Sequence, residues 1–188
     1  MKIGILGGTF NPIHIGHLIL AEEAREKLSL DKVIFVPAYL PPHKENGDII
    51  SAAKRINMLR LAIKTNPFFS VSDIEIKRKG KSYTIDTLKE FKKVYPKDKL
   101  YFITGSDLLK YLDEWKDLKQ VIRAVKFIVA TRPGYPLEKI PSYIKTVAIR
   151  AVDISAFEIR KAIKTKRSFR YLVLEAVYSY ITKNRLYR

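Results

Sequence analysis

The segment from Gly7 to His17 carries the clearest chemical signal in this chain: it reads Gly-Gly-Thr-Phe-Asn-Pro-Ile-His-Ile-Gly-His. Its paired glycines follow the apolar run from Ile3 to Leu6, which we interpret as a strand. Glycines just after a strand permit a tight turn and let a phosphate approach backbone N–H groups. His14 and His17 are three residues apart, so they would share one face of a helix. The segment therefore predicts a phosphate-binding turn with two imidazoles beside it.

The whole string resembles the (T/H)xGH motif of the adenylyltransferases related to class I aminoacyl-tRNA synthetases, which transfer AMP from ATP. It looks most like the motif of the bacterial nicotinate mononucleotide adenylyltransferases. The resemblance implies catalytic roles for His14 and His17. It also implies that ATP contacts Gly8, Thr9 and Phe10, together with His17.

A second candidate segment, Pro41-Pro42-His43-Lys44, follows a predicted strand. Its two prolines stiffen a loop that ends in two groups able to carry positive charge. A rigid surface turn would explain these residues without any ligand. The segment resembles the phosphate-contacting loop of the same family, which implies that His43 contacts the mononucleotide and Lys44 contacts ATP.

The third segment reads Ser-Tyr-Thr-Ile-Asp-Thr-Leu over residues 82–88. Thr84 is a candidate helix N-cap, with Asp86 favourably placed in the first turn. Capping leaves Tyr83 unexplained. The segment resembles the Ser-Tyr-Thr-x-x-Thr-Leu signature of the family, which implies that Tyr83 and Thr84 line the mononucleotide site, whether or not Thr84 also caps the helix.

Gly105-Ser106-Asp107 follows the fourth predicted strand, and Trp115 comes shortly after it. An acidic residue beyond a strand end can accept hydrogen bonds from ribose hydroxyls, but Asp107 could equally be a helix N-cap. A lone tryptophan is ordinarily a core residue. The resemblance implies that Gly105 and Asp107 contact ATP and that Trp115 stacks on the pyridine ring.

Arg132-Pro133-Gly134-Tyr135 follows the fifth predicted strand. The planar guanidinium of Arg132 suits a phosphate because it can donate two parallel hydrogen bonds. A lone arginine in a loop is often only solvated. The segment resembles an Arg-Pro-Gly-Tyr element of the family, which implies that Arg132 contacts the substrate.

The last segment contains Ser155 and Glu158 in the Ser-x-x-Glu spacing of a capping box. It also resembles the family's Ile-Ser-Ser-Thr-x-Ile-Arg motif, whose helix start and arginine hold the ATP phosphates. Ala156 and Phe157 replace the second serine and the threonine, so hydroxyl contacts from those positions are lost. The resemblance therefore implies ATP contacts from Ser155 and Arg160, with Arg160 also acting in catalysis.

The elements that must position these segments alternate between short β-branched runs and helical patterns. Strands are predicted at 2–6, 32–36, 69–74, 100–104, 126–131 and 146–148. Helices are predicted at 16–28, 52–64, 85–94, 107–112, 156–163 and 171–182. This alternation predicts an α/β fold, a Rossmann-like doubly wound parallel sheet forming a single domain over residues 1–188, with C-terminal helices. Ligands of such sheets bind beyond the carboxyl ends of the strands, which is where these motifs fall.

Composition narrows the class of protein further. The 188 residues are 47% hydrophobic, which suits one globular domain with a substantial core. The chain has no cysteine, which excludes disulfides, Cys-based zinc sites and a thiol nucleophile. No apolar run suits a signal peptide or a bilayer span, so we expect a cytoplasmic protein without a membrane partner. No metal-binding cluster is visible, and we expect Mg²⁺ to arrive with ATP rather than at a protein metal site.

The net charge of +17 would attract polyanions, so nucleic acid has to be considered as a partner. The basic residues are scattered among apolar ones, and we interpret them as a solvated surface that favours anionic nucleotides.

The resemblance implies transfer of AMP from MgATP to nicotinate mononucleotide, giving nicotinate adenine dinucleotide and pyrophosphate in NAD biosynthesis. The alternatives are a same-fold enzyme using nicotinamide mononucleotide or phosphopantetheine, and a basic nucleic-acid-binding domain. The sequence leaves the oligomeric state open, a homo-oligomer included.

Overall fold

The computed structural model describes residues 1–42, 49–130, 140–150 and 152–188. Within these ranges, six parallel strands form one sheet in the order β3-β2-β1-β4-β5-β6. The strands are β1 (Lys2–Gly8), β2 (Lys32–Pro37), β3 (Phe69–Val71), β4 (Lys99–Gly105), β5 (Lys126–Ala130) and β6 (Ile144–Val147). The chain builds outward from β1 to β3, returns to the other side of β1, and builds outward again. This confirms the predicted doubly wound sheet, whose order reverses between β1 and β4.

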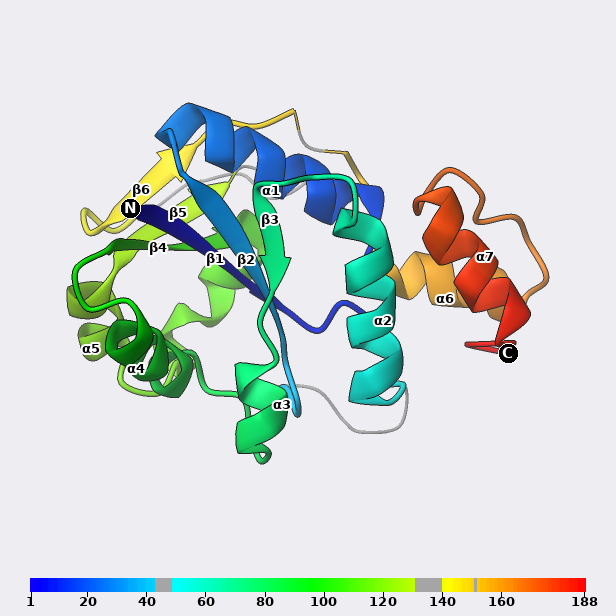
Figure 1. Cartoon of the computed structure of the whole chain (residues 1–188), viewed down its shortest axis with the longest axis horizontal. Coiled ribbons are helices and arrows are strands. Elements are labelled where there is room, and N and C mark those ends of the chain that lie inside the picture. Colours follow the sequence, from blue (N-terminus) through cyan, green and yellow to red (C-terminus); the bar gives the residue numbers. More distant parts are fainter. Residues whose placement is uncertain (43–48, 131–139, 151) are drawn as a thin grey trace.

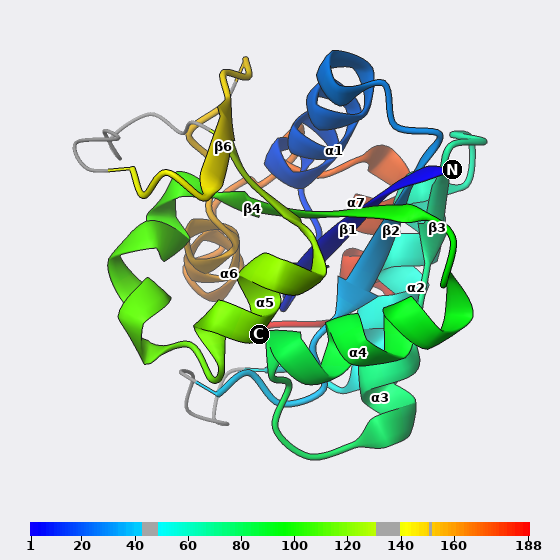
Figure 2. The same cartoon turned by 90° about the vertical axis from the view of Figure 1, so that its left-hand side faces the viewer.

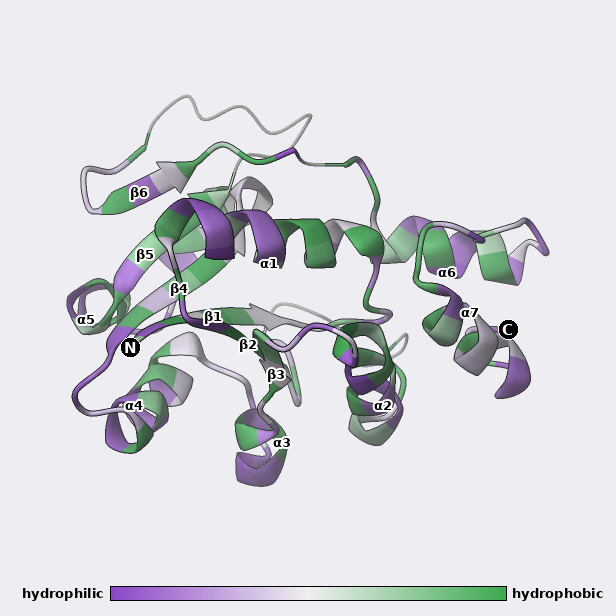
Figure 3. Ribbon diagram, turned by 45° about the horizontal axis from the view of Figure 1, so that its top comes forward, coloured by the Kyte–Doolittle hydropathy of each residue, from purple (hydrophilic) through white to green (hydrophobic). Residues whose placement is uncertain are grey.

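The helices cover both faces of the sheet (Figure 1). They are α1 (Ile15–Leu28), α2 (Ala52–Ile63), α3 (Ile74–Arg78), α4 (Thr84–Val94), the 3-10 helix η2 (Ser106–Glu114), α5 (Leu118–Ala124), α6 (Ala156–Lys164) and α7 (Glu175–Lys183). Figure 3 shows α1 on one side of the sheet, with α3 and α4 on the other. Figure 2 shows α4 and α5 side by side. No described helix is both long enough and apolar enough to cross a membrane.

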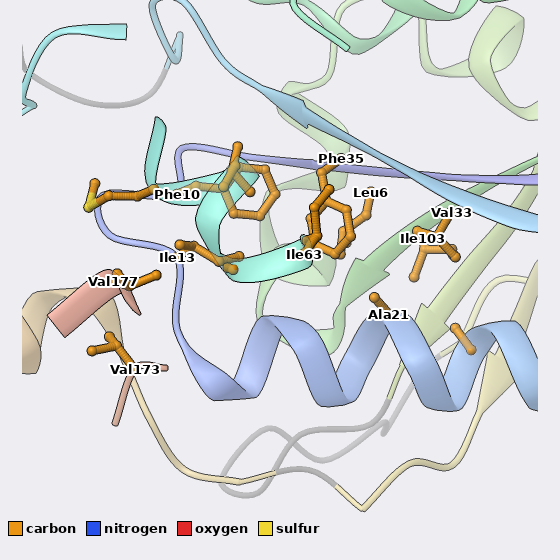
Figure 4. Close-up of a cluster of buried hydrophobic side chains, with 14 of the residues drawn as sticks. Leu6, Phe10, Ile13, Ala21, Val33, Phe35, Ile63, Ile103, Val173 and Val177 are labelled. Carbon is orange, nitrogen blue, oxygen red and sulfur yellow. The ribbon is translucent and has the colours of Figure 1, made fainter. Parts of the chain in front are cut away.

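The central strands are apolar at nearly every position because both of their faces are buried. Successive side chains point to opposite faces of a strand. Leu6 and Ile103 therefore join the cluster that contains residues of α1, α2, α6 and α7, part of which Figure 4 shows. Ile5 and Phe102 join the cluster formed with α4 and α5. Each face of the sheet has its own hydrophobic core.

The helices α6 and α7 lie at the opposite end of the molecule from the N-terminus, with α7 beside α2 (Figure 1). Figure 4 places Val177 of α7 near Ile13, which belongs to the turn between β1 and α1. The C-terminal part of the chain therefore packs against the segment that carries the first motif.

Several predicted elements differ from those observed, and the strand predicted at 146–148 is β6, which spans Ile144–Val147. The strand predicted at 69–74 ends at Val71, because Asp73 becomes the N-cap of α3 and accepts the Lys77 N–H. The helix predicted at 107–112 is a 3-10 helix. The helix predicted at 171–182 starts only at Glu175, since Tyr171 has a φ of 70°, in the left-handed region that helices exclude. The short helices α3 and α5 were not predicted, and residue 131 lies outside the described residues.

Candidate active site

The turn that follows β1 is shaped by a close approach between Gly8 and Phe10. A Cβ atom at Gly8 would lie 3.0 Å from the Phe10 ring, so a larger residue there would require the buried ring to shift. The Phe10 ring is buried, 5.0 Å from the His17 ring centroid and 5.8 Å from that of Phe35. Phe10 has a φ of 48°, which a non-glycine residue holds only when its surroundings impose it. Any contact between Phe10 and ATP therefore has to come from its main chain.

The two histidines lie against each other at the start of α1, as their spacing predicts. Their ring centroids are 3.6 Å apart. His14 is the N-cap, and its backbone N–H donates to Nδ1 of His17 over 3.2 Å. A neutral imidazole whose Nδ1 accepts carries its proton on Nε2, so His17 presents an N–H donor from Nε2.

Gly16 makes room for this arrangement. A Cβ atom at Gly16 would lie 3.1 Å from Nδ1 of the buried His14 ring, closer than ordinary van der Waals contact. The glycine of the His-Ile-Gly-His string therefore lets the His14 ring pack over the first turn of α1. The spacing of the string has a packing explanation as well as a chemical one.

The helix α6 joins the turn after β1 through Arg160. Nη1 of Arg160 donates to the backbone oxygen of Asn11 over 2.9 Å. Ser155 is the N-cap of α6, and its Oγ accepts the Glu158 N–H over 3.1 Å, which confirms the predicted cap. Phe157 is well exposed in the same first turn, with the guanidinium of Arg160 5.9 Å from its ring centre. The structure thus brings Arg160 beside the Gly7–His17 turn.

A cavity of about 170 Å³ opens on the opposite side of this turn. It lies beyond the carboxyl ends of β1 and β2 and under the start of α4, where a doubly wound sheet binds ligands. Its lining includes Gly7, Gly8, Thr9, Pro41, Pro42, Glu75, Tyr83, Thr84, Thr87, Phe102, Trp115 and Lys116.

Hydrogen bonds connect the two loops that border the cavity. The Tyr39 N–H donates to Oγ of Ser82, and the Ser82 N–H donates to the backbone oxygen of Leu40, each over 2.9 Å. These bonds hold the Pro41-Pro42 segment beside Tyr83. Thr84 is the first residue of α4 and Tyr83 its N-cap, so the predicted capping role of Thr84 is wrong.

Trp115 is both a packing residue and a cavity wall. Its ring packs on Phe102 and Phe127, with centroid distances of 5.7 and 5.6 Å, and it also lines the cavity. Next to it, Nζ of Lys116 lies 4.8 Å from the Tyr83 ring centre and pairs with Asp86 over 3.3 Å. The cavity therefore offers a flat aromatic surface bordered by a positive charge.

Glu75 is a buried carboxyl in the cavity wall that the sequence did not single out, because the short helix α3 was not predicted. Oγ1 of Thr87 donates to its Oε1 over 2.6 Å. Burial raises the pKa of Glu75, while hydrogen bonds from Thr87 and Ser82 and the charge of Arg78 lower it, and the balance is a raised pKa. Glu75 thus links the start of α4 to the loop that precedes it.

The structure places the remaining predicted site residues as follows. Gly105 ends β4 and is the N-cap of η2, so Asp107 is not an N-cap; its backbone lies in the first turn of η2. His43, Lys44 and Arg132 lie outside the described residues. In the described part of the chain, no three His, Asp or Glu side chains come together as a metal site.

The turn after β1 thus separates two groups of residues. The histidines and Arg160 lie on the side of α1 and α6, and the aromatic cavity lies on the side of α4. Gly8 and Thr9 border the cavity and lead directly into the histidine segment. Such a site can hold two ligands whose reacting groups meet over one stretch of main chain.

Comparisons with known proteins show which family the chain belongs to. Residues 5–162 match the family described as cytidylyltransferase-like. A protein of Desulfitobacterium hafniense (strain Y51) named "Probable nicotinate-nucleotide adenylyltransferase" is 44% identical over 198 residues, spanning 100% of this chain and 96% of the relative. A Thermus thermophilus protein of the same name is 44% identical over 188 residues, spanning 100% of both chains. The chain belongs to the nicotinate-nucleotide adenylyltransferase family.

The fold of this chain also matches that of a solved structure. The nicotinic acid mononucleotide adenylyltransferase of Plasmodium falciparum, solved in complex with NaAD, superposes with a TM-score of 0.81. The match covers 99% of this chain and 97% of that chain at 22% sequence identity. The same parallel sheet and helical layers are therefore kept where most residues differ.

The raised pKa of Glu75 predicts how its substitution changes stability with pH. As the pH rises, the unfolded chain releases the Glu75 proton before the folded protein does. The contribution of Glu75 to stability is therefore complete at pH values below its unfolded pKa, and it is lost as the pH rises through its folded pKa. Glu75→Gln keeps an oxygen acceptor for Thr87 without the charge. The pKa of Glu in an unfolded chain is near ~4.3. We therefore expect the Tm of Glu75→Gln minus the Tm of the parent to be larger at about pH 7.5 than at about pH 4.5.

Differential scanning calorimetry at the two pH values measures this difference. Glu175→Gln is a matched control because Glu175 is an exposed carboxylate paired with Arg170 over 3.2 Å and does not line the cavity. A difference in Tm between Glu75→Gln and the parent that is the same at both pH values would contradict the prediction.

Proposed function

We propose that this chain transfers AMP from MgATP to nicotinate mononucleotide, giving nicotinate adenine dinucleotide and pyrophosphate in NAD biosynthesis. The observation that carries the proposal is the meeting of two half-sites at Gly8 and Thr9. One half offers an aromatic cavity for a pyridine ring, and the other offers imidazole and guanidinium groups for a triphosphate. The names of relatives 44% identical over the whole chain support the same reaction.

The chemistry fits the side chains present. The second pKa of a phosphate monoester is near ~6, so the acceptor phosphate is mostly ionised at neutral pH and attacks the α-phosphorus of ATP without a general base. Pyrophosphate then leaves with the electron pair of the broken bond. The protein has to align two polyanions and stabilise the charge that develops on the leaving group. His14, His17 and Arg160 suit this electrostatic task.

We assign the remaining residues by their side of the turn. The main chain of Gly8, Thr9 and Phe10 approaches the ATP phosphates, and Ser155 with the start of α6 approaches them from the other side. The proposed mononucleotide residues are Tyr83, Thr84 and Trp115 in the cavity wall, with His43 and Arg132. The proposed ATP residues further include Lys44, Gly105 and Asp107.

Magnesium enters this proposal as part of the substrate. The described residues contain no cluster of three His, Asp or Glu side chains that could hold it, and the ion would arrive with ATP and offset the charge of its phosphates. The positive net charge of +17 favours both anionic substrates without requiring a nucleic-acid partner. We further propose that the enzyme works in the cytoplasm.

His17 is predicted to donate from Nε2 to the triphosphate. His17→Ala removes that donor and the acceptor of the His14 N–H. His17→Asn keeps an acceptor oxygen near the position of Nδ1 but has no second donor at the position of Nε2. We expect both variants to lose ~10²–10³ in kcat, the usual cost of one transition-state donor, and only His17→Ala to lose Tm as well.

Pyrophosphate release and thermal melting of the two His17 variants check this prediction. A folded His17→Asn protein with near-normal turnover would remove His17 from the catalytic residues.

Trp115→Ala should weaken the binding of nicotinate mononucleotide much more than the binding of ATP, because the proposed stacking partner is the pyridine ring. Phe127→Leu is the matched control, since Phe127 packs on Trp115 but is buried and does not line the cavity. We expect the control to lower Tm while the ratio of the two KM values stays constant. Equal losses for both substrates in Trp115→Ala, with a large fall in Tm, would show that Trp115 is only a packing residue.

A panel of acceptors tests the proposed reaction itself. At fixed MgATP, kcat/KM for pyrophosphate release is compared among nicotinate mononucleotide, nicotinamide mononucleotide and phosphopantetheine. A site built for a carboxylate offers hydrogen-bond donors, and the amide of nicotinamide mononucleotide would place its N–H₂ against one of them. This mismatch costs roughly 1–3 kcal/mol, or about 5- to 150-fold in specificity. Equal or better use of the amide would overturn the acid preference but keep the reaction. Activity only with phosphopantetheine would overturn the acceptor class, and salt-sensitive nucleic-acid binding without turnover would overturn the enzyme assignment.

A further inference from the structure

Asn11 is a buried junction between the turn after β1 and two distant parts of the chain. Its side chain is 4% exposed, and Oδ1 accepts from the Tyr187 hydroxyl over 3.0 Å and from the Ile50 N–H over 3.3 Å. Its backbone oxygen accepts from Arg160 over 2.9 Å. One asparagine in the proposed ATP-binding turn is therefore held by α6, by the chain entering α2 and by the C-terminal tail.

The tail is folded back so that Tyr187 can reach Asn11. Arg185 and Tyr187 have φ values of 51° and 64°, and the Leu186 N–H donates to the backbone oxygen of Ile181 over 3.0 Å. Leu186 and Tyr187 are both buried. Burial raises the pKa of Tyr187 above its ordinary value, so its hydroxyl stays protonated and donates to Asn11.

A second buried group, Arg55, holds the same turn at Thr9. Arg55 is 1% exposed and donates to the backbone oxygen of Thr9 over 2.8 Å and to that of Ile50 over 3.1 Å. Burial lowers the pKa of Arg55, and the nearby Tyr187 and Glu75 raise it. The turn is thus bonded at Thr9 and at Asn11, on either side of Phe10.

This double attachment explains how Phe10 keeps a positive φ. A non-glycine residue in the left-handed region is strained, and it keeps that conformation only where its surroundings over-determine it. Bonds on both flanks of Phe10, together with its packed ring, supply that constraint. They also fix the main chain at Gly8 and Thr9, which borders the cavity.

We propose that Tyr187 is a positioning residue for the ATP half-site: through its hydrogen bond to Asn11, the C-terminal tail fixes the turn whose main chain and histidines bind the triphosphate. The proposal rests on the proposed function in one respect, namely that this turn binds ATP. It makes the C-terminal Leu-Tyr-Arg ending part of the active-site architecture, 176 positions away from Asn11.

The test is Tyr187→Phe, which deletes one hydroxyl. Without the bond the turn is less well fixed, and a small displacement of reacting groups is costly. We expect kcat/KM for ATP to fall roughly 3- to 30-fold, with the KM of nicotinate mononucleotide unchanged, and the affinity for ATP alone in calorimetric titration to fall within the same range. The full chain is assayed well below its Tm.

Tyr180→Phe is the matched control. Tyr180 lies on α7, and its hydroxyl accepts from Nδ2 of Asn57 in α2 over 3.3 Å rather than bonding to Asn11. We expect its kcat/KM for ATP to match the parent. In an Asn11→Ala background, Tyr187→Phe should cause no further loss, because the bond is already gone. If Asn11→Ala does not fold, the comparison of Tyr187→Phe with Tyr180→Phe tests the proposal by itself.

The outcomes separate this proposal from the proposed function. Unchanged ATP affinity and kcat/KM in Tyr187→Phe, with only a lower Tm, would overturn the positioning role and leave a structural one. A parent protein that binds ATP but does not use nicotinate mononucleotide would overturn the proposed acceptor, while the ATP titrations would still test Tyr187. Equal losses in Tyr187→Phe and Tyr180→Phe would also overturn the proposal.

Discussion

The packing of the Phe10 ring beneath Gly8 is the constraint on which the rest of the site depends. It favours a glycine at the end of β1, where the strand order reverses, and leaves the ring 5.0 Å from that of His17. Because the side chain is buried, the main chain of the turn is what remains for a ligand. The buried donors Arg55 and Tyr187 make this geometry stable by bonding the flanking residues.

The turn also lies between two sets of functional groups, one on each face of the sheet. On the α1 and α6 side, imidazole and guanidinium groups suit a polyanion, and on the α4 side the cavity suits a flat ring. The two cores that cover the sheet are separate, so each half-site packs against its own hydrophobic core. A reaction that joins two nucleotides needs such a design, because its barrier falls mainly by alignment and by charge stabilisation.

Much of the fold was predictable because its signals are local. Buried parallel strands read as apolar runs, and the histidine spacing and the Ser155 cap act within one helical turn. The short helices α3 and α5 carry too few residues for a periodic pattern. The roles of Glu75, Arg55 and Asn11 depend on partners far apart in the chain, and no local pattern reports a bond between residues 176 positions apart. Thr84 shows the reverse error, since a good capping residue became the first residue of the helix it was expected to cap.

The most direct test of two half-sites meeting at Gly8 and Thr9 is a crystal structure of this protein with nicotinate adenine dinucleotide bound. We predict that the pyridine ring occupies the cavity against Trp115. The two phosphates should lie over the main chain of the turn, and the adenosine should extend past His17 toward α6. An adenine ring in the Trp115 cavity, or a dinucleotide bound away from the turn, would contradict the assignment.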